Sequence, residues 1–155
     1  MASAERFPIG SILLIHDYHL PTATKDKFFI VLGTEGDNLH LLSMTTSKIY
    51  FDAGLLRHGL IVDRDMSVYC FEQGRKIGEK GFCFHKHTII SHRSNVHRLS
   101  PAQLASYEIK VCDRLVKQEL IELLYSFFKY RGTKNKDRRL FESLLDSLSL
   151  PNDIY

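Results

Sequence analysis

Three short apolar runs near the N-terminus constrain the fold more than any other feature of the chain. They are Ser11–Ile15, Phe28–Leu32 and Leu39–Leu42. Short apolar runs bounded by turn residues are typical of buried strands. The polar stretch His19–Lys27 (HLPTATKDK) predicts a long loop between the first two, and Gly33–Asn38 (GTEGDN) favours a tight hairpin between the last two. The pattern predicts the start of a small antiparallel barrel.

A second hairpin is expected further along the chain. Ser67–Phe71 and Gly81–Ile90 are rich in β-branched and aromatic residues, and the segment between them contains two glycines. If Gly81–Ile90 is extended, Cys83, His85 and His87 share one face of the strand. Cys and His are zinc ligands, but this spacing matches no common structural zinc motif, so we expect no metal.

The composition changes at Ser100-Pro101, which is a strong helix start because a hydroxyl at the N-cap precedes proline at the first helical position. Apolar residues at helical spacing predict one long helix over 101–131, and a kink or break near Lys117–Glu119 is left open. After a charged linker, Leu140–Leu150 predicts a second, shorter amphipathic helix. Strands first and helices last indicate an α+β fold. The expected domains are a barrel over 1–99, a long helix packed on it over 100–131, and a linker with a short helix over 132–155.

Composition indicates the general class of protein but says little about its function. The 155 residues are 44% hydrophobic and 25% charged, which suits one packed domain. The net charge of +3 does not by itself indicate a nucleic-acid partner, so a local basic patch would have to do so. We expect no membrane span and no signal peptide, because the chain lacks the apolar runs that both require. Three cysteines at unpatterned spacings predict free thiols in a reducing cytoplasm.

The chain resembles the PemK/MazF-like family over roughly residues 9–117. The resemblance rests on a first strand that begins at Gly10, the second-strand sequence Lys25–Gly33 (KDKFFIVLG), a third strand that runs into Thr45-Thr46-Ser47, and the helix start Arg98–Leu104 (RLSPAQL). It implies an SH3-like barrel and a metal-independent endoribonuclease of a toxin–antitoxin pair. The partners it implies are single-stranded RNA, an antitoxin protein and a second copy of the chain; no cofactor is expected. The family usually opens its second strand with Arg-Pro, whereas this chain has Lys-Asp-Lys-Phe.

The resemblance also implies where the site lies. The catalytic Thr or Ser of the family closes the third strand, which Thr45, Thr46 or Ser47 would do here, and Thr46-Ser47 best fits the Thr-Ser pair that is usual in the family. The hairpin predicts that Lys27, which opens the second strand, faces Thr45 and Thr46 across one groove, with the loop 18–26 as one wall. Lys27 would hold a phosphate, and a threonine hydroxyl would donate to a non-bridging oxygen. Basic or titratable residues expected to contact RNA are His16, His19, Lys25, Lys86 and Arg93.

An alternative class of function is left open by the sequence. Lysine supplies a positive charge but not the bidentate fork with which arginine grips a phosphate. The same barrel without catalytic activity would serve as a protein-binding or nucleic-acid-binding module. Two lysines near a turn are also common on ordinary solvated surfaces, so only the three-dimensional arrangement of these residues separates the alternatives.

Overall fold

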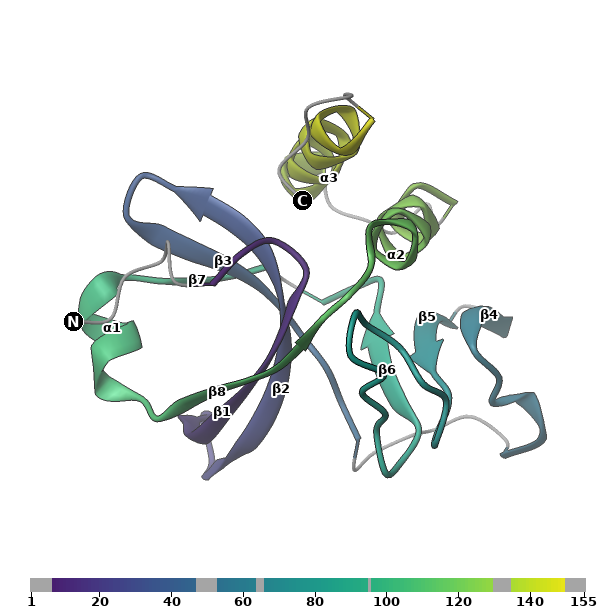
Figure 1. The fold of residues 1–155 in the computed structure, drawn as a ribbon, viewed down its shortest axis with the longest axis horizontal. Coiled ribbons are helices and arrows are strands. Elements are labelled where there is room, and N and C mark those ends of the chain that lie inside the picture. The colour runs from purple at the N-terminus through teal and green to yellow at the C-terminus, as the bar shows by residue number, and fades with distance from the viewer. Residues whose placement is uncertain (1–6, 47–52, 64–65, 95, 130–134, 150–155) are drawn as a thin grey trace.

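The protein is described by a computed structural model that covers residues 7–46, 53–63, 66–94, 96–129 and 135–149. Within these ranges the strands form two antiparallel sheets (Figure 1). The five-stranded sheet has the order β7-β3-β2-β1-β8, and the three-stranded sheet has the order β4-β5-β6. The five-stranded sheet contains β1 (Ser11–His19), β2 (Thr24–Glu35), β3 (Asn38–Ser43), β7 (Val96–Leu99) and β8 (Ile109–Arg114). The smaller sheet contains β4 (Gly59–Asp63), β5 (Met66–Phe71) and β6 (Thr88–Ser91).

The helices cover these sheets from two sides. A 3₁₀ turn, η2 (Ala53–Leu55), precedes β4, and α1 (Pro101–Ser106) lies beside β7. Two longer helices, α2 (Lys117–Lys129) and α3 (Asn135–Leu148), pack together above the junction of the two sheets (Figure 1). No helix in the described ranges has both the length and the apolarity that a membrane span requires.

The α+β class and the first three strands are confirmed. Each predicted apolar run lies within β1, β2 or β3, and β2 pairs with β3 across the predicted hairpin. Among the described residues the pairing does not close into a barrel, since β7 and β8 are the outer strands of their sheet. One bridge between Thr45 and Ile89, with N–H···O distances of 2.9 and 3.0 Å, links the end of β3 to β6 in the smaller sheet.

Burial on both faces explains why β2 is continuously apolar. Ile30 and Leu32 face a core shared with the smaller sheet, α2 and α3, whereas Phe29 and Val31 face a second core closed by β7 and α1. All four side chains are fully buried. A strand with two covered faces shows a continuous apolar run instead of alternation. The sheet is therefore the middle layer of the molecule.

The predicted long loop between the first two strands is wrong. The two strands continue past their apolar runs and still pair at His19 and Thr24, so the connection is only residues 20–23. The register shifts between Ile15 and Tyr18, and Asp17 has a φ of 51°. This is a β-bulge, which re-aims the side chains beside it. The polar character of the stretch indicates an exposed pair of strands, not an unpaired loop.

The predicted long helix over 100–131 is also wrong. Ser100 does cap α1, since its hydroxyl accepts from the Gln103 N–H and the Gln103 side chain accepts from the Ser100 N–H. The helix ends after six residues, at the extended cap residue Tyr107. Residues 109–114 then form β8, which pairs with β1, and α2 begins at Lys117. The β-branched Ile109 and Val111 suit a strand, and the edge of β1 supplies the hydrogen bonds that hold it.

Two further segments differ from expectation. Within Gly81–Ile90 only Thr88–Ile90 is strand, because the preceding residues form turns through glycines of positive φ at 74, 78 and 81. The alternation that would have aligned Cys83, His85 and His87 therefore does not apply. The last helix, α3, begins at Asn135, so it includes part of the predicted charged linker, and residues 132–134 and 150–155 lie outside the described ranges.

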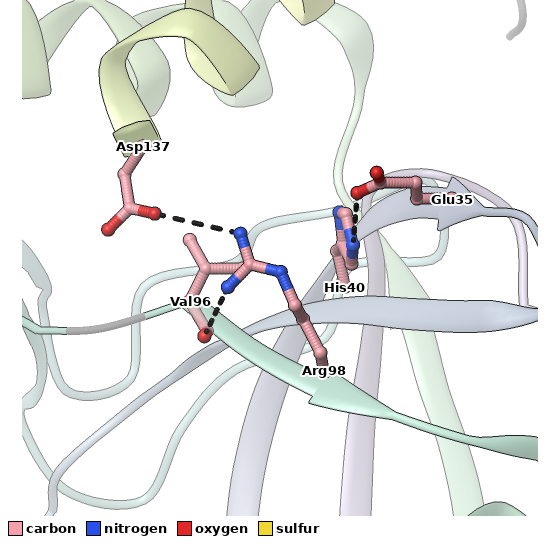
Figure 2. Close-up of polar contacts among 5 residues, drawn as sticks. All are labelled: Glu35, His40, Val96, Arg98 and Asp137. Carbon is pink, nitrogen blue, oxygen red and sulfur yellow. Dashed lines mark hydrogen bonds and ion pairs between the residues drawn. The ribbon is translucent and has the colours of Figure 1, made fainter. Parts of the chain in front are cut away.

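A polar cluster of two buried and two exposed side chains links the first turn of α3 to β7 and β3 (Figure 2). Asp137 is 2% exposed, and its carboxylate lies 3.9 Å from the Arg98 guanidinium, which also donates to the Val96 carbonyl at 3.3 Å. On the neighbouring strand the buried His40 lies 3.3 Å from Glu35. Burial, and next the Arg98 charge, lower the pKa of His40. The cluster therefore links α3 to β7 through the Arg98–Asp137 ion pair, with His40 and Glu35 beside it.

A second buried network joins the smaller sheet to α2. The Ser67 hydroxyl lies 2.6 Å from His92 Nδ1, and His92 Nε2 lies 2.8 Å from the Ser126 hydroxyl. Ser126 donates its own proton to the Leu123 carbonyl. The two hydroxyls therefore hold both ring nitrogens of the imidazole. Burial lowers the pKa of His92 to about 4, so the imidazole is neutral near pH 7.

We predict that His92 makes the fold sensitive to acid. Its pKa is about 4 in the folded chain against an ordinary value of 6.5, so the unfolded chain binds the extra proton first. Stability is therefore fully present above pH 6.5 and falls as the pH drops towards 4, by on the order of 3 kcal/mol. Urea unfolding at several pH values measures this. His92→Gln should be less stable at pH 7 and show a flatter pH dependence, whereas the exposed His85→Gln should follow the wild type. An unchanged pH slope in His92→Gln would contradict the assignment.

Candidate nucleic-acid interface

Two adjoining pockets form a groove where β1, β2 and β8 meet the segment before β6. The larger has a volume of about 360 Å³ and the smaller about 230 Å³, and Leu14, Phe28 and Thr46 line both. The larger pocket is further lined by Phe82, Cys83, Phe84, His85, Lys86, Thr88, Lys110 and Cys112. The smaller is further lined by Lys25, Asp26, Lys27 and Met44. We call the two together the groove.

Three phenylalanines form the floor of the larger pocket. Phe28 comes from β2, and Phe82 and Phe84 come from the turns before β6. The Phe84 ring packs edge-on against both others, with ring centroids 5.0 Å apart in each pair. Phe84 is buried, whereas Phe28 and Phe82 remain partly exposed. A partly exposed aromatic floor provides faces on which a planar ligand can stack.

A buried carboxylate holds the turn segment in place. Asp113 on β8 is 5% exposed and accepts from the backbone N–H groups of Lys80, Phe82 and Arg114 at 2.6–3.2 Å. The backbone at Gly78 passes so close that a Cβ there would lie 2.6 Å from the Asp113 carboxylate. Gly78 also has a φ of +78°, which favours glycine for a second reason. Asp113 therefore fixes where Phe82 lies.

Basic side chains surround the aromatic floor. Lys86 and Lys110 are exposed at the larger pocket, and Lys25 is exposed at the smaller one. Lys27 is half-buried; burial first and the charge of Lys25 second lower its pKa. A chain with a net charge of only +3 thus places four lysines around one groove. These four lysines form a local basic patch, which the net charge of the whole chain did not indicate.

A histidine–carboxylate pair borders the smaller pocket. The bulge in β1 brings His16 Nδ1 to 3.4 Å from the Asp26 carboxylate, which also accepts from the Asp17 N–H at 3.1 Å. That backbone hydrogen bond is the main reason that the pKa of Asp26 is lowered. An ionised carboxylate beside Nδ1 orients the imidazole through that nitrogen and leaves Nε2 for a different partner. This arrangement is suited to general acid–base chemistry.

The structure brings Lys27 and Thr46 to the same pocket, with a difference from the predicted arrangement. Both line the smaller pocket at the end of the β2–β3 hairpin. By strand alternation Lys27 lies on the same face of β2 as Phe29. The ring of His97 packs against Phe29, and burial first and the Lys27 charge second lower the pKa of His97. Thr45 lines neither pocket, and its backbone forms the bridge to Ile89. Ser47 lies outside the described residues.

The other predicted RNA-binding residues divide between the groove and other surfaces. Lys25 and Lys86 line the groove, and His16 contacts its residue Asp26. His19 lies instead against the Tyr107 ring at 5.5 Å between ring centroids, and Arg93 lies in the turn after β6. Neither of these two lines the groove.

Sequence reasoning missed much of the groove. It did not identify Asp26, the aromatic floor, Lys110 or Asp113. The Phe-Cys-Phe run at 82–84 was a usable signal, but the contribution of β8 was hidden by the incorrect helix. Cys83, His85 and Cys112 do line the larger pocket together. In the described part of the chain, however, no three His, Cys, Asp or Glu side chains are placed to hold a metal ion.

We predict that Asp113 stabilises the groove more than any exposed acidic residue does. Asp113→Ala leaves backbone donors without their charged acceptor and should lower the free energy of unfolding by about 3 kcal/mol. Asp113→Asn keeps one carbonyl oxygen and should cost about half as much. Urea unfolding measures both, with the exposed Asp146→Ala on α3 as the control. A loss below about 1 kcal/mol in Asp113→Ala would contradict the role given to this carboxylate.

Comparisons with protein-family models, curated proteins and solved structures found no match to this chain. The resemblance to PemK/MazF-like proteins therefore stays an expectation, and it rests on the sequence features that suggested it. Any function has to be argued from the side chains of the groove. Their chemistry is an aromatic floor, a lysine rim and a histidine–carboxylate pair.

Proposed function

We propose that the protein binds single-stranded RNA in the groove and cleaves it without a metal ion, as a divergent PemK/MazF-like protein with an SH3-like architecture. The observation that carries the proposal is the partly exposed aromatic floor, Phe28 and Phe82, bordered by Lys86 and Lys110. Stacking faces interleaved with cations are how proteins bind single strands, because bases stack while phosphates meet positive charge. A duplex keeps its bases stacked inside, so it would not use this floor.

The smaller pocket supplies the groups that the cleavage step needs. His16, oriented by Asp26, would take the proton of a ribose 2′-hydroxyl, and the 2′-oxygen would form a bond to phosphorus. The bond from phosphorus to the 5′-oxygen would break, and that oxygen would take a proton from the Lys27 ammonium. Thr46 would donate to a non-bridging phosphate oxygen. The products are a 2′,3′-cyclic phosphate and a 5′-hydroxyl.

Binding without cleavage is the second candidate. It is favoured by the position of Lys27, which is half-buried and acts electrostatically on His97, and by the lack of the Arg that the family usually has. The groove would then be a binding site alone. The two candidates share the RNA-binding step and differ only in whether bound RNA is cut.

We predict that removing two rim lysines weakens RNA binding. Fluorescence anisotropy with a labelled single-stranded 12-mer should show that Lys86→Ala with Lys110→Ala lowers affinity at least about tenfold at low salt. The slope of log affinity against log salt should become shallower by about 1.4, because two phosphate contacts are lost. Arg57→Ala with Arg139→Ala removes the same charge from exposed positions outside the groove and should have little effect. Equal losses of RNA affinity in the two double variants would show that binding depends only on the overall charge. That result would contradict an RNA site in the groove.

Cleavage is tested with the same RNA. If the protein is a ribonuclease, cutting should persist in EDTA and stop when the cleaved position lacks its 2′-hydroxyl. His16→Asn should reduce the cleavage rate by about 100-fold, and Asp26→Asn by about tenfold, with RNA affinity nearly unchanged. Intact RNA after long incubation with a wild-type protein that binds it would select the binding module instead.

A further inference from the structure

A third pocket lies between α2 and the inner face of the smaller sheet. It has a volume of about 460 Å³ and shares no lining residue with the groove. Its lining comes from β4, β5 and one face of α2, namely Gly59, Leu60, Tyr69, Gln118, Ile121, Glu122, Tyr125 and Ser126. A volume of this size is that of a small-molecule site.

Two buried residues with hydroxyl groups line this pocket, Tyr69 and Ser126, and the Ser126 hydroxyl is already bonded to His92 and Leu123. Tyr69 is the other. It is 3% exposed, and its ring packs edge-on against His58 and Phe71, with ring centroids 5.9 and 5.3 Å apart. Its hydroxyl forms no hydrogen bond within the described part of the chain. The hydroxyl oxygen is not sealed from solvent, so a ligand in the pocket can form a hydrogen bond to it. Nδ1 of the adjacent His58, by contrast, is fully buried without a hydrogen-bond partner.

The electrostatics of the pocket favour a cation. Burial first, and then the charges of Glu122 and Glu119, raise the pKa of Tyr69 to about 12, and Glu122 lines the pocket with it. Glu119 already accepts from the backbone N–H groups of Gly78 and Val116 at 2.9 Å. Glu122 is exposed at the lip and forms no ion pair within the described residues. Its carboxylate is therefore available to a ligand.

An exposed aromatic ring completes the arrangement. Tyr125 lies one residue before Ser126 on α2, is 54% exposed and lines the pocket. Aromatic faces beside a carboxylate attract organic cations through the ring quadrupole as well as through charge. Arg75 is the described cation that acts on Tyr69, and its effect on the Tyr69 pKa is smaller than that of either carboxylate. At the adjacent His58, which does not line the pocket, Arg75 acts more strongly than either carboxylate, so the excess of negative charge belongs to the Tyr69 side.

We propose that this pocket binds an organic cation that carries a guanidinium or primary ammonium group. Glu122 supplies the counter-charge, Tyr125 the ring face, and the Tyr69 hydroxyl accepts a hydrogen bond from the buried end of the cation. Two sources can present this chemistry, a free small molecule and the basic side chain of a peptide. The site is independent of RNA binding, because none of its residues lines the groove.

Calorimetric titration with n-butylguanidine and n-butylurea tests the proposal, because the two have nearly the same shape and differ in charge. The guanidine should bind at least about tenfold more tightly than the urea. Glu122→Gln should weaken guanidine binding by about tenfold, and Tyr69→Phe, which keeps the ring, by about threefold. Glu142→Gln, an exposed acidic residue on α3, is the control and should bind as the wild type does.

Equal binding of the guanidine and the urea, no binding of either at about 10 mM (about 10,000-fold above a dissociation constant of about 1 μM), or an unchanged affinity in Glu122→Gln would each overturn the proposal. The peptide acetyl-Gly-Arg-Gly-amide distinguishes the two sources. Tighter binding of this peptide than of butylguanidine assigns the site to a partner's arginine, and weaker binding assigns it to a free small molecule.

Discussion

The burial of β2 on both faces is the constraint on which the rest of the structure depends. Phe29 and Val31 need one covering layer and Ile30 and Leu32 need another, so the chain must supply elements to both sides of the sheet. The smaller sheet with α2 and α3 covers one face, and β7 with α1 covers the other. At Lys25–Phe28, β2 extends beyond the elements that cover its two faces. It reaches the surface there, and the groove begins at this point.

The groove exists because elements far apart in the sequence are tied together at that point. The Asp113 carboxylate on β8 fixes the turns that carry Phe82, and the Thr45–Ile89 bridge ties the end of β3 to β6. Both ties use groups that are satisfied inside the protein, so the floor can be rigid while the lysines around it stay exposed. A pre-formed stacking floor lowers the entropy cost of ordering a flexible strand on binding.

The parts of the fold that sequence could predict were local. The three apolar runs and the Ser100 cap depend on neighbouring residues, and each was found where expected. The strand β8 was missed because Val111 also fits the helical spacing of its neighbours, and only the open edge of β1, nearly 100 residues earlier, favours a strand. The site followed the same pattern. Lys27 and Thr46 could be paired from the hairpin, whereas Lys110 and Asp113 could not be placed once β8 was read as helix.

Hydrogen–deuterium exchange with and without a single-stranded RNA oligonucleotide tests RNA binding in the groove without any mutation, because it locates the bound RNA. RNA should slow exchange in residues 82–88 and 109–112, which bear the floor and rim of the larger pocket. Residues 59–63 of β4, on the other pocket, should exchange as in the free protein. Slower exchange confined to β4 or α3, or no change at saturating RNA, would contradict RNA binding in the groove.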